Sequence, residues 1–561
     1  MTVEERLKLS LVCVDAVKRA VAAYHTAAKE AGSRPADGLE VQDSALQALC
    51  SGVGEHAGQL EELVQDEDVV ALVCDQAGVD AMCALAMALP ALQPPAVGGT
   101  ASVSGAAQAL LLEAVHVLKA VAANSRCMTK VLEHDKGRTL VKMLASVQGV
   151  EPAAPAVQAG LAGLMEIGIQ HDAIRRTLLK KSWNYAAAGA AAPQRVSLLA
   201  AAASAAADKQ NPSLIEAALG CVTNAAFEEA GKEQLLAYEQ GRAQDSVLDI
   251  ALTIADSNPS GSGYGGASAG VLRAKAMRLL LNVTAAGPIR KLVGAGRGLG
   301  FLVRILDEQV AGAGGAAYSA AAADSLQHGQ DVMDTALGLM MNLGLEDAHA
   351  EELVARGALT PLAAVLAGCP WSSCAARAAA AAARLLRFPA AAAQGRERGM
   401  LQALLQLIVR NAPGGGQVAD GGEVLSGAAS ARALEASCEL LDPAVRALAQ
   451  GLRNDEGSVR VVGEDTAALA ALVATVRCGR EGTVGNAALA LQMVGNNDDH
   501  LERLGQAGAV PALLDVVHHM RGPAQRNAAL ALARVVKRPE NLALLKALHG
   551  LDILNCYLKL K

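Results

Sequence analysis

Apolar residues recur along this chain at the spacing of amphipathic helices, and a phrase of sequence repeats near the C-terminus. Asn486-Ala-Ala-Leu-Ala-Leu491 returns as Asn527-Ala-Ala-Leu-Ala-Leu532. The phrase Gly508-Ala-Val-Pro511 echoes Gly357-Ala-Leu-Thr-Pro361. The pattern predicts one helix after each such glycine and one before it, with helices over Leu359–Leu366, Val510–Val517, Leu551–Leu558, Ala336–Leu345, Ala487–Val494 and Ala528–Val536.

Helical units that repeat about every 40 residues are typical of an α-solenoid. One unit cannot bury both of its apolar faces alone, so neighbouring units stack and contacts stay local. Glycine junctures of the same kind occur at Gly78, Gly137, Gly241, Gly298, Gly399 and Gly550, with weaker ones near Ala187 and Gly463. We therefore predict an all-α fold, a right-handed superhelix of about ten repeats.

Two stretches resemble the armadillo repeat. They are Ala336-Leu-Gly-Leu-Met-Met-Asn342-Leu and, after it, Ala350-Glu-Glu-Leu-Val-Ala-Arg-Gly357-Ala-Leu-Thr-Pro361-Leu. In that family a long third helix carries an asparagine that faces the concave groove, and Asn224 and Asn282 look like the same position. HEAT repeats share the packing logic and are the alternative, although the Gly-Ala-Val/Leu-Pro junctures favour armadillo.

The resemblance implies a binding groove for an extended peptide. Armadillo proteins hold a peptide backbone with a ladder of asparagines, since an amide both donates and accepts hydrogen bonds. The candidate rungs are Asn224, Asn282 and Asn342, and the alternative is that these amides tie neighbouring loops together. Nuclear-import adaptors of the family place a Trp one turn earlier, where this chain has Gly220, Arg278 and Gly338, and later rungs read Met493 and Val535. A role as a nuclear-import adaptor is therefore less expected than another protein-binding role.

The predicted organisation has five segments. They are a helical cap (1–60), divergent repeats (61–210), repeats with Gly/Ser/Ala-rich insertions (211–410), a loop with a divergent repeat (411–480) and C-terminal repeats (481–561). The insertions are 92–105, 256–270, 311–325 and 412–427, which are surface additions or segments that a partner orders. Met1–Lys29 reads as an amphipathic capping helix, and Leu551–Lys561 is an apolar end.

Charge gives a second candidate surface. The net charge is −7, which argues against nucleic acid as the partner of the whole molecule. Locally the balance reverses, because Arg175, Arg176, Lys180 and Lys181 cluster in one stretch and Arg521, Arg526, Arg534, Lys537 and Arg538 in another. These are solvated helix faces or a basic groove for an acidic protein segment. The candidate partner-binding residues are Asn224, Asn282, Asn342, Arg278, Arg526, Arg534, Lys537 and Arg538.

The sequence offers no catalytic, cofactor or metal site. Aromatic residues make up 2% of the chain, too few to line a ligand pocket. Gly294-Ala-Gly296-Arg-Gly298 imitates a nucleotide loop, but Gly298 already serves as a repeat juncture. Cys369 and Cys374 lack further ligands at zinc spacing, and Asp498, Asp499 and His500 read as a solvated capping turn.

We expect a non-enzymatic interaction scaffold without a membrane span. The charged start Glu4-Glu5-Arg6 does not fit a secretory signal, and the alanine-rich 185–207 is too weakly apolar for a bilayer. Eleven scattered cysteines fit a reducing, cytoplasmic compartment. The family includes cytoskeletal and axonemal (ciliary) members that bind tubulin, which is the preferred specific expectation. A co-chaperone for Hsp70 or Hsp90 clients is the alternative, and the sequence leaves the oligomeric state open.

Overall fold

The protein forms two compact units, Met1–Ile289 and Arg290–Lys561. The structure is a computed structural model that describes residues 2–31, 38–64, 66–76, 78–88, 105–124, 166, 175, 183–185, 194–196, 212–240, 246–257, 268–295, 298–312, 323–413, 427–478 and 480–559. The four predicted insertions fall largely outside these residues, as do Arg176, Lys180, Lys181 and the junctures at Gly137 and Gly241. The five-segment division stays a prediction.

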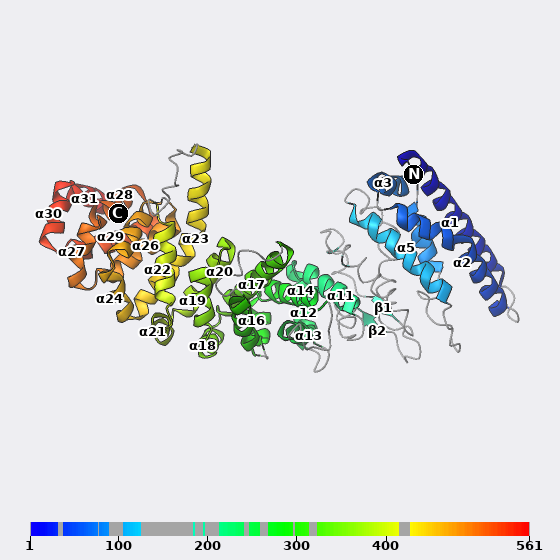
Figure 1. Ribbon diagram of the computed structural model, residues 1–561, viewed down its shortest axis with the longest axis horizontal. Helices are drawn as coiled ribbons and strands as arrows, with labels where there is room; N and C mark the ends of the chain where they lie inside the picture. Colours follow the sequence, from blue (N-terminus) through cyan, green and yellow to red (C-terminus); the bar gives the residue numbers. More distant parts are fainter. Residues whose placement is uncertain are drawn as a thin grey trace. The chain divides into compact units, whose positions relative to one another are not determined.

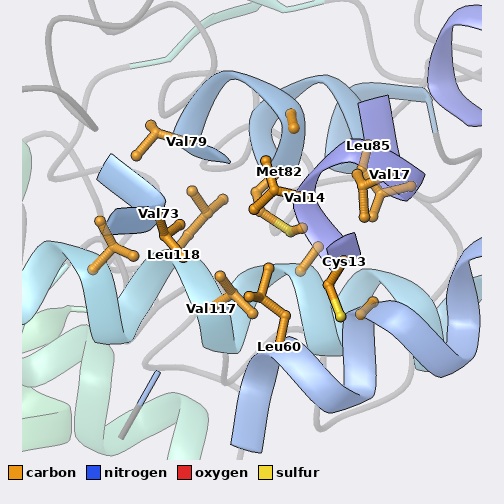
Figure 2. Packing of buried hydrophobic residues seen from close by; sticks show 14 of the residues in the cluster. Cys13, Val14, Val17, Leu60, Val73, Val79, Met82, Leu85, Val117 and Leu118 are labelled. Carbon is orange, nitrogen blue, oxygen red and sulfur yellow. The ribbon is translucent and has the colours of Figure 1, made fainter. Parts of the chain in front are cut away.

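The first unit opens with five helices that surround one apolar core. The helices are α1 (Val3–Ala31), α2 (Gly38–Leu63), α3 (Glu67–Asp75), α4 (Gly78–Ala88) and α5 (Gly105–Ala123). Long α1 packs along α2, and α5 packs on both α2 and α4. Cys13 and Val17 of α1 meet Leu60 of α2, Met82 of α4 and Leu118 of α5, all almost fully buried (Figure 2). Each of the valine, leucine and methionine side chains contributes about 1.5–3 kcal/mol of hydrophobic stabilisation.

A short antiparallel pair is a local exception to the helical fold. β1 (Trp183–Tyr185) pairs with β2 (Gln194–Val196), with Trp183 opposite Val196. The sequence analysis did not predict these strands, although aromatic and β-branched residues favour them. The further helices that the structure describes in this unit are α11 (Pro212–Ala225), α12 (Glu229–Gln240), α13 (Val247–Asp256), α14 (Ser268–Val283) and the first residues of α15 (Gly287–Ala295).

The second unit repeats one motif of three helices, coloured from green to red in Figure 1. A short first helix is followed by an apolar second helix and a longer third helix. The elements are α16 (Gly298–Gly312), α17 (Ala323–Leu343), α18 (Asp347–Ala355), α19 (Leu359–Gly368), α20 (Ser372–Leu385), α21 (Pro389–Glu397), α22 (Met400–Asn411), α23 (Gly427–Asn454), α24 (Glu456–Glu464), α25 (Thr466–Val476), α26 (Glu481–Val494), η4 (Asp498–His500), α27 (Leu501–Gln506), α28 (Ala509–His519), α29 (Gly522–Val535), α30 (Pro539–Ala547) and α31 (Gly550–Lys559).

Equivalent helices stack on one another in this unit. The third helices pack in the order α17, α20, α23, α26 and α29, and the second helices in the order α16, α19, α22, α25, α28 and α31. Each helix therefore contacts its counterparts in neighbouring repeats, which is the packing of a solenoid. The six helices expected from the sequence are all present, in α17, α19, α26, α28, α29 and α31.

The repeat junctures depend on a residue with positive φ. Gly357, Gly399 and Gly508 have φ of 88°, 81° and 81° and lie just before a second helix. In the last repeat the residue with positive φ is His549 (φ 55°), so the juncture predicted at Gly550 lies one residue earlier. The juncture predicted near Gly463 also differs, because Gly463 lies inside α24 and Asp465 caps α25.

Glycines in the first helices make room for polar side chains of the next repeat. A Cβ added to Gly294, Gly463 or Gly505 would overlap the side chain of His349, His500 or Asn541, respectively. Asn541 Nδ2 donates to the carbonyl oxygens of Leu501 (2.8 Å) and Val535 (2.9 Å), joining its own repeat to the preceding one. These glycine and polar pairs connect successive repeats.

Candidate functional site

Four third helices of the second unit, α17, α20, α26 and α29, end at equivalent places, which defines a row of equivalent positions. The next-to-last residues of α17, α20, α26 and α29 are Asn342, Arg384, Met493 and Arg534. In the first unit, α11 and α14 have Asn224 and Asn282 at the same place. α23 continues to Asn454 and lacks this end point. The rung that we predicted at Val535 is wrong by one residue, since Val535 is fully buried and Arg534 occupies the position.

The three predicted asparagine rungs differ in their surroundings. Asn224 Nδ2 donates to the backbone oxygen of Glu166 at 3.4 Å, so this amide ties two helical segments together. Asn282 and Asn342 are partly buried. Asn224 thus fits the alternative role, in which the amide joins neighbouring segments of the protein. A peptide-holding role for Asn282 and Asn342 stays a prediction.

Two asparagines from the repeated phrase also join third helices. Asn527 Nδ2 donates to the Gly485 carbonyl oxygen at 2.9 Å, linking α29 to α26. Asn486 Nδ2 lies 3.4 Å from Asp442 Oδ1, linking α26 to α23. The repeated phrase therefore marks structural contacts between repeats, and the sequence analysis did not assign this role.

The predicted basic residues divide into paired and exposed ones. Arg538 contacts Glu502 (3.0 Å) and Glu540 (2.9 Å), and Lys537 Nζ lies 3.9 Å from Asp498. Arg526 and Arg534 are exposed on α29, and no residue within the described segments pairs with them. The unpaired positive charges among these four therefore lie on the third helix, α29, and the paired ones lie in the turn after it.

Two other predicted basic residues belong to the first unit. Arg278 is exposed on α14. Arg175 is buried and forms an ion pair with Glu228 at 3.0 Å, so it belongs to the packing rather than to a solvated face.

Sequence reasoning missed a group of arginines at the middle of the row. Arg384 lies at the end of α20, Arg387 in the turn that follows it, and Arg446 on α23, which packs against α20. Partial burial lowers the pKa of Arg384, and the positive charges of Arg446 and Arg387 lower it further. The signal that identifies Arg384 is its next-to-last place in α20, which requires knowledge of the helix end.

The remaining candidates for chemistry have structural roles. Asn497 caps η4 by accepting a hydrogen bond from Asp499 N, as expected for a capping turn, but His500 is 2% exposed and therefore not solvated. Gly294 lies in α15, where it leaves room for His349. Cys369 is half-buried and Cys374 buried, both as thiols.

The described segments contain no group of three His, Cys, Asp or Glu side chains that could hold a metal. No single described helix is long and apolar enough to cross a membrane, although α3 and most of α4 reach that length together across an 80° bend.

Successive three-helix repeats, positive-φ junctures and a row of third helices define an α-solenoid of armadillo-like repeats. No family model matches the sequence, and no curated protein is significantly similar to it. The fold resembles an engineered protein of known structure, with a TM-score of 0.56 and 17% identity, covering 87% of this chain and 95% of the other.

Two further structures resemble the fold with lower TM-scores. A designed armadillo repeat protein has 22% identity and a TM-score of 0.37, covering 51% of this chain and 99% of its own. A structure from work on a phosphorylation switch between cadherin and β-catenin has 13% identity and a TM-score of 0.47, covering 96% of this chain and 99% of its own. At these identities the comparisons establish the fold alone.

Proposed function

We propose that this protein is a non-enzymatic protein-binding scaffold whose second unit holds an extended, acidic segment of a partner along the third helices. The observation that carries the proposal is the pair Arg384 and Arg534. Both occupy the next-to-last position of a third helix, both are exposed, and neither has an acidic partner in the described segments. Arginine forms charge-assisted hydrogen bonds with carboxylates, so the row suits an acidic ligand.

The spacing of the row suits an extended chain. Packed helices lie about 8–10 Å apart, so the three steps from α20 to α29 span roughly 24–30 Å. An extended peptide advances about 3.4 Å per residue, so about seven to nine residues cover that distance. Acidic residues at the two ends of such a segment would reach Arg384 and Arg534.

The wider composition favours a protein partner over nucleic acid. The net charge of −7 repels phosphate backbones outside the basic row, and 2% aromatic residues provide few surfaces for stacking bases. An armadillo-like fold is typically a scaffold rather than an enzyme, which supports the non-enzymatic part of the proposal.

The proposed setting is the cytoplasm, at the cytoskeleton or cilium. It follows from the family resemblance together with an acidic partner, because tubulin or axonemal proteins are the partners that armadillo proteins of that setting bind. A co-chaperone that acts on Hsp70 or Hsp90 clients is an outcome of the test below.

The test measures binding of a fluorescein-labelled, twelve-residue peptide of glutamate and glycine to the full chain by fluorescence anisotropy. Double charge reversal, Arg526→Glu with Arg534→Glu, should weaken binding about tenfold or more, and added salt should reduce the difference. Lys537 and Arg538 are left unchanged, because their reversal would break ion pairs with Asp498 and Glu502.

The matched control is Arg460→Glu with Arg477→Glu, which changes the same charge at exposed arginines outside the third helices. Equal binding by both double variants and the wild type would overturn the proposal. In affinity capture from lysate, tubulin lost only with the Arg526 and Arg534 variant supports the cytoskeletal setting. Chaperones captured equally by all three proteins would replace that setting with the co-chaperone role.

A further inference from the structure

Three arginines gather where α20 meets α23, and we call them the Arg384 triad: Arg384, Arg387 and Arg446. Arg384 is the next-to-last residue of α20, and Arg387 lies in the turn two residues after the helix ends. Arg446 belongs to the neighbouring third helix, and its charge acts on Arg384 together with that of Arg387. The triad therefore joins two successive repeats.

Two members of the triad have acidic partners and the third has none. Arg387 pairs with Asp347 and also donates to the carbonyl oxygen of Gly344 at 3.2 Å. Arg446 contacts Asp442 at 2.6 Å. Arg384 makes no ion pair or side-chain hydrogen bond with any residue that the structure describes. With both aspartates counted, the group keeps a net charge of about +1.

The arrangement is unfavourable for the free protein. Partial burial and the two neighbouring guanidinium groups lower the pKa of Arg384, so its charged form is held against repulsion. The stem of Arg384 lies against the end of α17, where a Cβ on Gly344 would be 3.2 Å from Arg384 Cβ. That contact restricts the side chain. A cation held in such a place without an internal partner suggests a binding role.

Part of the triad remains open to solvent, although Arg387 Nε is buried and has no hydrogen-bond partner among the described residues. Arg446 is 49% and Arg387 29% exposed, and each guanidinium has five N–H donors, of which the ion pairs use only some. Arg387 also lies over the ring of Phe388, 4.9 Å from its centre, which steadies its orientation. The triad thus presents several N–H donors from two repeats.

We propose that the Arg384 triad is a subsite for a phosphate monoester, carried by a phosphorylated serine or threonine of the segment that the row holds. The proposal rests on the function proposed above. A phosphate monoester carries about −1.5 to −2 charges at neutral pH and three terminal acceptor oxygens, whereas a carboxylate has two oxygens and one charge. The phosphate group can therefore accept from guanidinium groups of both helices at once and offset their repulsion.

Nucleic acid is a less suitable source of that phosphate. A nucleic-acid site would need further basic and aromatic surface, and the chain has a net charge of −7 with 2% aromatic residues. A phosphodiester also carries one charge fewer than a dianionic monoester. A phosphorylated protein segment fits the isolated, three-arginine site better.

The experiment compares three fluorescein-labelled peptides of twelve residues, identical except for serine, glutamate or phosphoserine at the centre. Anisotropy with the full wild-type chain should show phosphoserine binding about tenfold tighter than serine, with glutamate in between. In Arg384→Gln all three peptides should bind more weakly, because Arg384 also belongs to the row that holds the acidic segment, and the phosphoserine advantage over serine should fall to about twofold or less. Arg460→Gln, which removes an exposed arginine of α24, should keep the full advantage.

A second measurement separates binding from folding. Removing a repelled charge should leave the thermal midpoint of Arg384→Gln equal to or above that of the wild type, most clearly at low salt. A lower midpoint would assign Arg384 a structural role and overturn the proposal.

The other outcomes also decide. Equal binding of the glutamate and phosphoserine peptides, or a full phosphoserine advantage in Arg384→Gln, would overturn the subsite and leave the scaffold function standing. If no peptide binds, both fail. A single-stranded oligonucleotide that displaces the phosphoserine peptide at lower concentration than free phosphopeptide does would replace it with a nucleic-acid site.

Discussion

Replacing Gly508 with alanine tests the backbone geometry that joins the repeats. Gly508 has φ of 81° and separates α27 from α28. A Cβ added there meets no atom within 4 Å, so steric overlap contributes nothing to the effect. The change therefore isolates the conformational penalty of a left-handed residue.

The magnitude follows from two opposing contributions. An alanine in the left-handed region costs about 1–2 kcal/mol, and alanine restricts the unfolded chain by about 0.4–1 kcal/mol relative to glycine. The net loss of unfolding free energy is about 0.5–1.5 kcal/mol. Gly508→Asn should lose less, because asparagine tolerates this conformation better than alanine. His549→Gly, at the equivalent position of the last repeat, should have the opposite effect and stabilise.

Hydrogen exchange of the full chain is the appropriate assay, because a solenoid opens locally. Amides of α27 and α28 should exchange up to about tenfold faster in Gly508→Ala, with amides of α19 and α20 unchanged as an internal control. Urea unfolding gives the global comparison. The reasoning would be refuted if the amides of Gly508→Ala exchanged at the wild-type rates. It would also be refuted if Gly508→Asn lost more unfolding free energy than Gly508→Ala.

Two further predictions concern contacts between repeats. Gly505→Ala should lower the unfolding free energy by about 3 kcal/mol or more, measured by urea unfolding. The new Cβ would displace the Asn541 amide and break its two hydrogen bonds. A loss no larger than that of Gly508→Ala would contradict this. Asp455→Asn should lose about 1 kcal/mol at pH 7, because asparagine can still cap α24 but loses the charge-assisted bonds from Arg396 and Ser458. Burial raises the pKa of the Asp455 carboxyl, but the hydrogen bonds from Ser458 and Arg396 outweigh it and lower the pKa. A carboxyl group with a lowered pKa stabilises the fold above about pH 4, and this stabilisation is lost as the pH falls. The unfolding free energies of the two proteins should therefore converge in acid. A constant difference down to about pH 2 would contradict the assignment.

The sequence predicted the parts of the fold that depend on periodicity and glycine. Apolar spacing located helices such as α19 and α28 to within one or two residues, because their buried faces are long and regular. Gly399 and Gly508 were predicted as junctures, and both adopt the conformation that glycine tolerates best. The solenoid followed from these local rules alone.

Features that depend on a precise helix end or on neighbours distant in sequence could not be predicted. The error at Val535 arose because one residue of register separates a buried side chain from the exposed Arg534. The Arg384 triad brings together residues about sixty positions apart, on α20 and α23, and no spacing rule connects them. His549 adopts positive φ although the next residue, Gly550, tolerates that conformation better, so residue type favoured the wrong position.

The glycine and polar pairs of the first helices bear on how such a chain can lengthen. The repeat from η4 to α29 contains His500, which needs a glycine in the repeat before it, and Gly505, which accepts a polar side chain from the repeat after it. A tandem copy of that repeat would bring its own His500 against the first copy's Gly505. This repeat therefore has both a polar side chain for the preceding repeat and a glycine for the following one, which suits it to duplication. A repeat that has only one of these features depends on its present neighbour.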